Sequence, residues 1–374
     1  MSIPGLTGVR GVAALWVVLF HIQGFATALH LPLLAGLPVV RNGWEGVDLF
    51  FLLSGFVLML GHEDDFHRLG KQALLRFAWL RVFRIYPLAT VVLLLILALV
   101  LIDRPFAARV AAGNIPPNLT LSSFIRTLLL ATRWWTPVDG DWNQPVWSLS
   151  AEIMGYAVFP LLAFAAGRVT SRAGLLVLTL VCLAYPTGIA WMHGQLVNSD
   201  LFWGAGTRMA GAFTGGILLC RLHRLTPETQ RRRQGAIADA GLVGLLVAQA
   251  LPAGAILGIF CFGAIVYGLA SNEGWTSRLC ASRPAMLLGR ISFPLYLVHV
   301  TVLSWLVFNV ATYATPAWAA AIGLLLALLF CFCLSWLLHV GIEQPAHNFA
   351  RSRARRPEVA RAGGEPIAVA TPSR

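Results

Sequence analysis

The chain is short of charged residues, and of lysine and acidic residues above all. Of its 374 residues only 12% are charged, 16 are acidic and one is lysine, whereas 57% are hydrophobic. This balance excludes an ordinary soluble domain and predicts a protein with several membrane-spanning segments. The net charge of +12 comes from arginines that lie between apolar runs and form no single patch, so it does not indicate nucleic-acid binding.

Several signals of other chemistries are also missing. No glycine-rich phosphate loop is present, and GAFTGG at 211–216 lies within an apolar run, where small residues serve close helix packing. The cysteines have neither metal-ligand spacing nor a disulfide framework. Ser54 lacks the G-x-S-x-G context of a hydrolase nucleophile, and no His pair at i, i+4 accompanies a carboxylate. We therefore expect no bound metal and do not favour Ser–His–Asp hydrolysis.

Ten apolar runs predict an all-α membrane protein, a bundle of about ten transmembrane helices. The runs are residues 10–29, 47–61, 85–102, 149–166, 174–192, 202–220, 237–251, 253–270, 291–311 and 317–341. With the N-terminus inside, 22 of the 28 Lys and Arg residues fall on the cytoplasmic side. This bias supports both the number of spans and an orientation with both termini in the cytoplasm.

The first run could instead be a signal peptide, because it has a basic residue, an apolar stretch and A-x-A at 26–28. The apolar stretch is long enough to continue as a span. Removing it would move the basic segment 62–84 to the outside, so we keep it as the first span.

The longest extracytoplasmic segment is 103–148. Its apolar piece 123–132 is too short to cross a membrane and predicts a re-entrant or interfacial helix. Residues 134–152 are rich in Trp and Pro, which is typical of a segment at the lipid–water boundary, although the rings could also stack on a sugar. At the other end of the chain, the Arg-, Pro- and Gly-rich residues 351–374 predict a disordered cytoplasmic tail after a membrane domain of residues 1–350.

Arg10 and His21 form the first candidate site. Eleven residues turn a helix by roughly 1100°, which places both side chains on one face, about 16 Å apart along the axis. A neutral imidazole near mid-bilayer can accept a proton, and a guanidinium at the cytoplasmic mouth can hold a phosphate. Alternatively, His21 is a core residue that bonds to a neighbouring helix.

Arg81, Arg84 and Glu152 are further charged residues at the ends of spans. Arg81 and Arg84 are three apart, so they share a helical face and could hold phosphates, or they could be an ordinary basic flank. Glu152 begins an apolar run, where a carboxylate needs a partner. It could orient a histidine from another span, or it could cap its own helix.

Asp48, Trp147 and His299 are candidates for substrate binding. Asp48 opens the second span, where an acid also has a capping role. Trp147 could stack on a sugar or belong to an interfacial aromatic belt. His299 lies inside an apolar run, either as a second site residue or as a packing group.

In their order along the chain, these motifs resemble the membrane-bound acyltransferase family 3 over about residues 4–350. The motifs are Arg10 to His21, GVDLFFLLSGF at 46–56, Arg81 to Pro87, WSLSAE at 147–152, ISFPLYLVH at 291–299 and EQP at 343–345. Each is weak alone, but their common order is specific.

The resemblance implies an O-acyltransferase of the bacterial inner membrane that moves an acyl group, most readily acetyl, from cytosolic acyl-CoA. The acceptor would be a hydroxyl of a cell-surface polysaccharide, a lipid-linked glycan or a glycosylated small molecule. Arg10, Arg81 and Arg84 would bind the CoA phosphates. His21 would be the general base or would carry the acyl group, and Glu152 would hold His21 or orient the acceptor. The alternative is a transporter of an anionic or lipid-linked glycan. The oligomeric state stays open.

Overall fold

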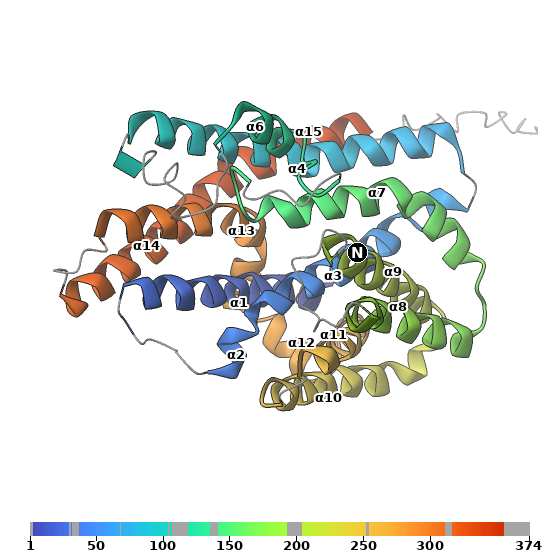
Figure 1. The fold of residues 1–374 in the computed structure, drawn as a ribbon. Helices are drawn as coiled ribbons and strands as arrows, with labels where there is room; N and C mark the ends of the chain where they lie inside the picture. Colours follow the sequence, from blue (N-terminus) through green and yellow to red (C-terminus); the bar gives the residue numbers. More distant parts are fainter. Residues whose placement is uncertain are drawn as a thin grey trace, which may run out of the picture.

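The structure is a computed structural model that describes residues 3–29, 31, 37–67, 69–103, 105–106, 119–134, 141–192, 204–251, 254–310 and 316–354. Within these ranges all regular structure is helical and no strand occurs (Figure 1), which confirms the all-α prediction. Seven described helical segments are long and apolar enough to cross a membrane: Pro4–Thr27, Gly43–His62, Lys71–Ile102, Val146–Gly167, Arg172–Met192, Arg283–Val307 and Ala317–Ala354. The membrane fold is thus confirmed, whereas the count of ten spans is not.

Each predicted span nevertheless coincides with a helix. The helices are α1 Pro4–Ala28, α3 Gly46–His62, α4 Lys71–Ile102, α7 Val146–Gly167, α8 Arg172–Met192, α9 Gly204–Arg224, α10 Arg231–Gln249, α11 Gly254–Leu269, α13 Arg283–Val310 and α14 Ala317–Leu338. The helix α11 has only 16 residues, and α9 and α10 carry basic residues and small residues that lower their hydropathy.

Shorter helices complete the described chain: α2 Pro38–Arg41, α6 Leu121–Leu128, α12 Trp275–Cys280 and α15 Gln344–Ala354. The predicted short helix of the outer segment is α6, whose first turn is capped because Thr120 Oγ1 accepts a hydrogen bond from Ser123 N at 3.2 Å. Its depth in the bilayer stays a prediction. The helix α15 continues four residues into the predicted tail, and residues 355–374 lie outside the described ranges.

Two helix pairs approach so closely that only glycine fits between them. Along α1 and α13, a Cβ on Gly289 would lie 2.1 Å from the carbonyl oxygen of Thr7. Between α3 and α9, a Cβ on Gly216 would lie 2.0 Å from the carbonyl oxygen of Leu52. The second contact confirms the packing role expected for residues 211–216. The helices α1 and α13, and likewise α3 and α9, are therefore held in backbone contact.

The helices form layers (Figure 1). In this view α4, α6 and α15 lie along one side, α10 and α12 along the other, and α1, α3, α7 and α13 between them. The outer helix α14 exposes Leu325, Leu326 and Leu329 by more than half. Such a face would be costly in water but needs no cover in lipid.

Candidate active site

A cavity of about 150 Å³ lies between α1, α3, α4, α7 and α13. Its wall is mostly apolar, with side chains such as Phe50 and Phe51. Among the described residues, its charged lining consists of Arg10, Arg81, Arg84 and Glu152. The structure thus brings the three predicted phosphate ligands to one place, together with the predicted carboxylate.

Arg81 and Arg84 face the cavity from one side of α4, as their spacing predicts. The guanidinium carbon of Arg81 lies 6.0 Å from the Tyr156 ring centre, and its Nε has no hydrogen-bond partner. Arg10 adds a third positive charge, which interacts with that of Arg84. Three guanidinia around one cavity suit an anion with several phosphates, because each can bind two oxygens.

Arg84 is already partnered. Its Nη1 donates to Glu343 Oε1, and Glu343 Oε2 accepts from His339 Nδ1 at 2.7 Å. Residues His339–Glu343 form a π-helical turn between α14 and α15, a feature that is common at functional sites. The motif EQP thereby gains a role that sequence reasoning did not give it: Glu343 holds one cavity arginine.

Glu152 accepts two hydrogen bonds at Oε1, from Ser54 Oγ at 2.6 Å and from Tyr156 OH at 2.7 Å. Ser54 and Tyr156 also line the cavity. No described hydrogen bond joins Glu152 to His21. Sequence reasoning missed Tyr156, although it lies four residues after Glu152 and hence on the same helical face.

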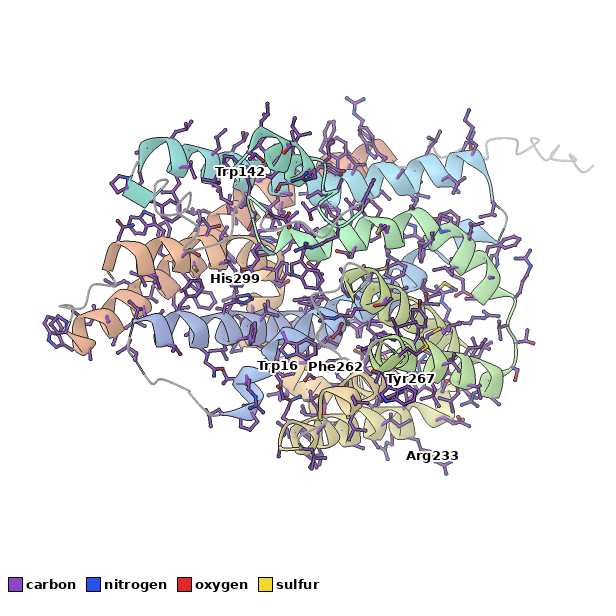
Figure 2. All side chains as sticks on the ribbon, viewed as in Figure 1. Trp16, Trp142, Arg233, Phe262, Tyr267 and His299 are labelled. Carbon is purple, nitrogen blue, oxygen red and sulfur yellow. The ribbon has the colours of Figure 1, made fainter. Side chains whose placement is uncertain are left out.

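His21 lies outside the lining of this cavity and contacts His299. His21 lies on α1 and His299 on α13. His21 Nδ1 is 3.3 Å from His299 Nε2, and the two ring centres are 4.9 Å apart with 71° between the ring planes. Figure 2 shows His299 between these two helices. The predicted catalytic histidine and the predicted substrate-binding histidine are therefore direct neighbours.

Tyr296 connects the cavity to the histidine pair, and Phe50 packs against it. Both line the cavity, and their ring centres are 5.8 Å apart. The Tyr296 ring centre is also 5.9 Å from that of His299, and its hydroxyl lies 2.8 Å from Ser148 Oγ. Tyr296 is therefore shared by the lining of the cavity and the surroundings of His299.

Asp48 and Trp147 lie around Arg208 rather than in the cavity lining. Arg208 binds both carboxylate oxygens of Asp48, at 2.8 and 3.0 Å, and its guanidinium carbon lies 5.4 Å from the Trp147 ring centre. This ion pair joins α3 to α9. The predicted substrate contacts of Asp48 and Trp147 stay predictions. Sequence reasoning missed Arg208, although a lone arginine inside an apolar run is itself a signal.

In the described part of the chain, no group of three His, Cys, Asp or Glu side chains could hold a metal ion.

The fold and site together define a helical membrane protein with an arginine-lined cavity beside a buried histidine pair. The model of the acyltransferase domain family matches residues 3–339, and the chain belongs to this family. The resemblance inferred from the motifs is thereby confirmed.

Curated relatives are acyltransferases. The acyltransferase MdmB of Streptomyces mycarofaciens is 28% identical over 379 residues, which cover 92% of each chain. The O-acetyltransferase OatA of Staphylococcus aureus is 22% identical over 80% of this chain, and the peptidoglycan O-acetyltransferase OatA of Listeria monocytogenes is 22% identical over 81%. The chain spans about half the length of these two OatA proteins. No solved structure matches it.

Proposed function

We propose that this acyltransferase moves an acyl group, most readily acetyl, from cytosolic acyl-CoA to a hydroxyl of a sugar-containing acceptor at the bacterial inner membrane. One observation carries the proposal: Arg10, Arg81 and Arg84 converge on a single cavity. CoA carries its phosphates at one end and its thioester at the other. When these arginines hold the phosphates, the part of CoA that carries the thioester is free to extend toward His21.

Tyr296 lines the cavity, and its ring centre is 5.9 Å from that of His299. We infer that donor binding displaces the Tyr296 side chain and opens a path from the cavity to His21.

His21 then acts on the acceptor hydroxyl. As a general base, its Nε2 takes the hydroxyl proton while the oxygen attacks the thioester carbonyl; the C–S bond breaks, and the thiolate receives the proton. In the other route, Nε2 attacks the carbonyl first, the C–S bond breaks and the CoA thiolate leaves. The acceptor oxygen then attacks the acyl-imidazole carbonyl, the N–C bond breaks, and the hydroxyl proton passes to the thiolate. General-base assistance contributes about 10²–10⁴-fold.

Glu152 serves the cavity rather than His21 in this proposal. It is the acidic residue among the described lining, and Ser54 and Tyr156 fix its carboxylate. It offsets part of the arginine charge when no donor is bound.

The sugar-containing acceptor is proposed because one relative is named a peptidoglycan O-acetyltransferase. Purified protein in liposomes, with labelled acetyl-CoA inside and candidate glycans outside, tests the whole scheme. Label in the glycan supports the acyltransferase with this donor and acceptor. Glycan flux without donor consumption would instead support a transporter.

A further inference from the structure

His299 is fully buried, with an exposed fraction of 0%. Its Nδ1 lies 2.9 Å from the carbonyl oxygen of Tyr296 and 3.1 Å from that of Leu295. Carbonyl oxygens only accept hydrogen bonds, so Nδ1 must carry the hydrogen. In the neutral ring, Nε2 then has a free lone pair, and this atom faces His21.

His21 has the complementary arrangement. Its Nδ1 lies 2.9 Å from the carbonyl oxygen of Val17 and 3.3 Å from His299 Nε2. One N–H shared between these two acceptors satisfies both distances, as in other three-centre hydrogen bonds. The hydrogen of neutral His21 therefore sits on Nδ1, and Nε2 has the free lone pair.

We propose that His299 is a positioning residue for His21. Together with the Val17 carbonyl oxygen, it holds the His21 ring in the Nδ1–H tautomer, which leaves Nε2 available for a proton or an acyl group. This inference rests on the proposed function, and it gives His299 a role other than the substrate contact expected from sequence. It also gives His299 the orienting role that sequence reasoning assigned to Glu152.

The pair resembles part of a catalytic triad, because one side chain, His299, orients the base, His21. When His21 Nε2 takes the hydroxyl proton, the positive ring donates more strongly from Nδ1 to His299 Nε2. His299 neither gains nor loses a proton in the cycle. A neutral partner suits a site inside lipid, since a second buried charge would carry a large desolvation cost.

Nitrogen NMR on wild-type protein labelled with ¹⁵N-histidine tests the tautomer directly. The His21 signals are assigned by difference from His21→Gln. We expect His21 to show hydrogen on Nδ1 and a bare Nε2. Hydrogen on Nε2 would overturn the proposal. Because this readout needs no substrate, it can fail or succeed independently of the acyltransferase assay.

A matched pair of substitutions tests the role in turnover. In His299→Gln, the side-chain amide reaches the former Nε2 position and its oxygen can accept from His21. In His299→Asn, the shorter amide reaches only the Nδ1 position. We expect His299→Asn to lower kcat by about 10–100-fold with an unchanged donor KM, and His299→Gln to recover most of that loss.

Monodisperse, wild-type-like melting in detergent checks the fold of each variant, and the surface variant His67→Gln is the activity control. Equal losses in both His299 variants would contradict the proposal. So would a loss confined to the acceptor KM, which would return His299 to substrate binding. If His299→Asn does not fold, His299→Gln is compared with wild-type protein alone, and a kcat loss of about tenfold or more would contradict the proposal.

Discussion

Arg84 and Glu343 form an ion pair that ties α4 to the π-helical turn between α14 and α15. Glu343 is almost fully buried, and His339 holds its other oxygen. Arg84 is thus fixed in place before any donor arrives, whereas the Nε of Arg81 is unpartnered. A phosphate at the cavity meets one pre-positioned guanidinium and one with unused hydrogen-bonding capacity.

Removing a cavity arginine should weaken donor binding. We expect Arg81→Ala and Arg84→Ala each to raise the donor Kd by about tenfold or more, because each loses a charge-assisted contact with phosphate. Calorimetric titration with CoA measures this directly. Arg172→Ala is the control, since Arg172 bonds Gln230 on the surface. Unaltered affinity for CoA would mean that Arg81 and Arg84 do not bind the donor and are only an ordinary basic flank of the span.

Glu152→Gln should strengthen donor binding several-fold, because it removes a negative charge that faces the arginines. The amide oxygen can still accept from Ser54 and Tyr156. Measuring both the donor KM and kcat separates an effect on donor binding from an effect on the chemical step. A large fall in kcat with an unchanged KM would give Glu152 a part in the chemistry.

His21→Ala should lower transfer by about 10²-fold or more, since it removes the base or acyl carrier. His67→Ala is the control, because His67 is exposed and its Nε2 lies 3.4 Å from a carboxylate oxygen of the exposed Asp64. Label transfer from acetyl-CoA is the measurement. Unchanged turnover in a folded His21→Ala protein would discard the role of His21.

Asp48→Ala should destabilise the fold by roughly 3–5 kcal/mol, because it leaves the buried Arg208 charge without its partner. The double variant Asp48→Asn with Arg208→Gln should recover part of the loss. Thermal unfolding in detergent compares the three proteins. If Asp48→Ala keeps wild-type stability and raises only the acceptor KM, Asp48 binds substrate as the sequence predicted.

Asp141, which lies outside the membrane spans, predicts that the stability of the fold depends on pH. Burial raises the pKa of Asp141 to about 6, against the opposing charge of Arg133 at 3.8 Å. A raised pKa means that the folded state favours the protonated acid. The stability this gives is complete below about pH 4, near the unfolded pKa, and is lost as the pH rises through about 6. Melting temperatures across this range should fall less steeply in Asp141→Asn; an identical slope would contradict the assignment.

The sequence was sufficient for the fold class and for the shared helical face of Arg81 and Arg84, whereas the convergence of Arg10 with them was implied only by the family resemblance. Apolar runs locate helices, and residues three apart on one helix must share a face. The same reasoning could not show which helices adjoin. The contacts between His21 and His299, and between Asp48 and Arg208, join residues 278 and 160 positions apart.

The expected link between Glu152 and His21 shows the same limit. Both residues are polar groups in apolar runs, and the family resemblance implies that Glu152 either holds His21 or orients the acceptor. The structure gives each a nearer partner, because Tyr156 lies one turn along α7 and α13 brings His299 to α1. Helix periodicity can predict a partner on the same helix, such as Tyr156, but not a partner on another helix, such as His299.

The wide turn at His339–Glu343 sets which way the following residues point. One extra residue in an ordinary α-helix would rotate everything after it by about 100°, and the wider turn absorbs most of that rotation. Because α15 packs on α4, the same residues in an uninterrupted α-helix would present a different side of the last described helix to its neighbour. The π-helical turn thus acts as a spacer that preserves the rotational alignment of the C-terminal helix against α4.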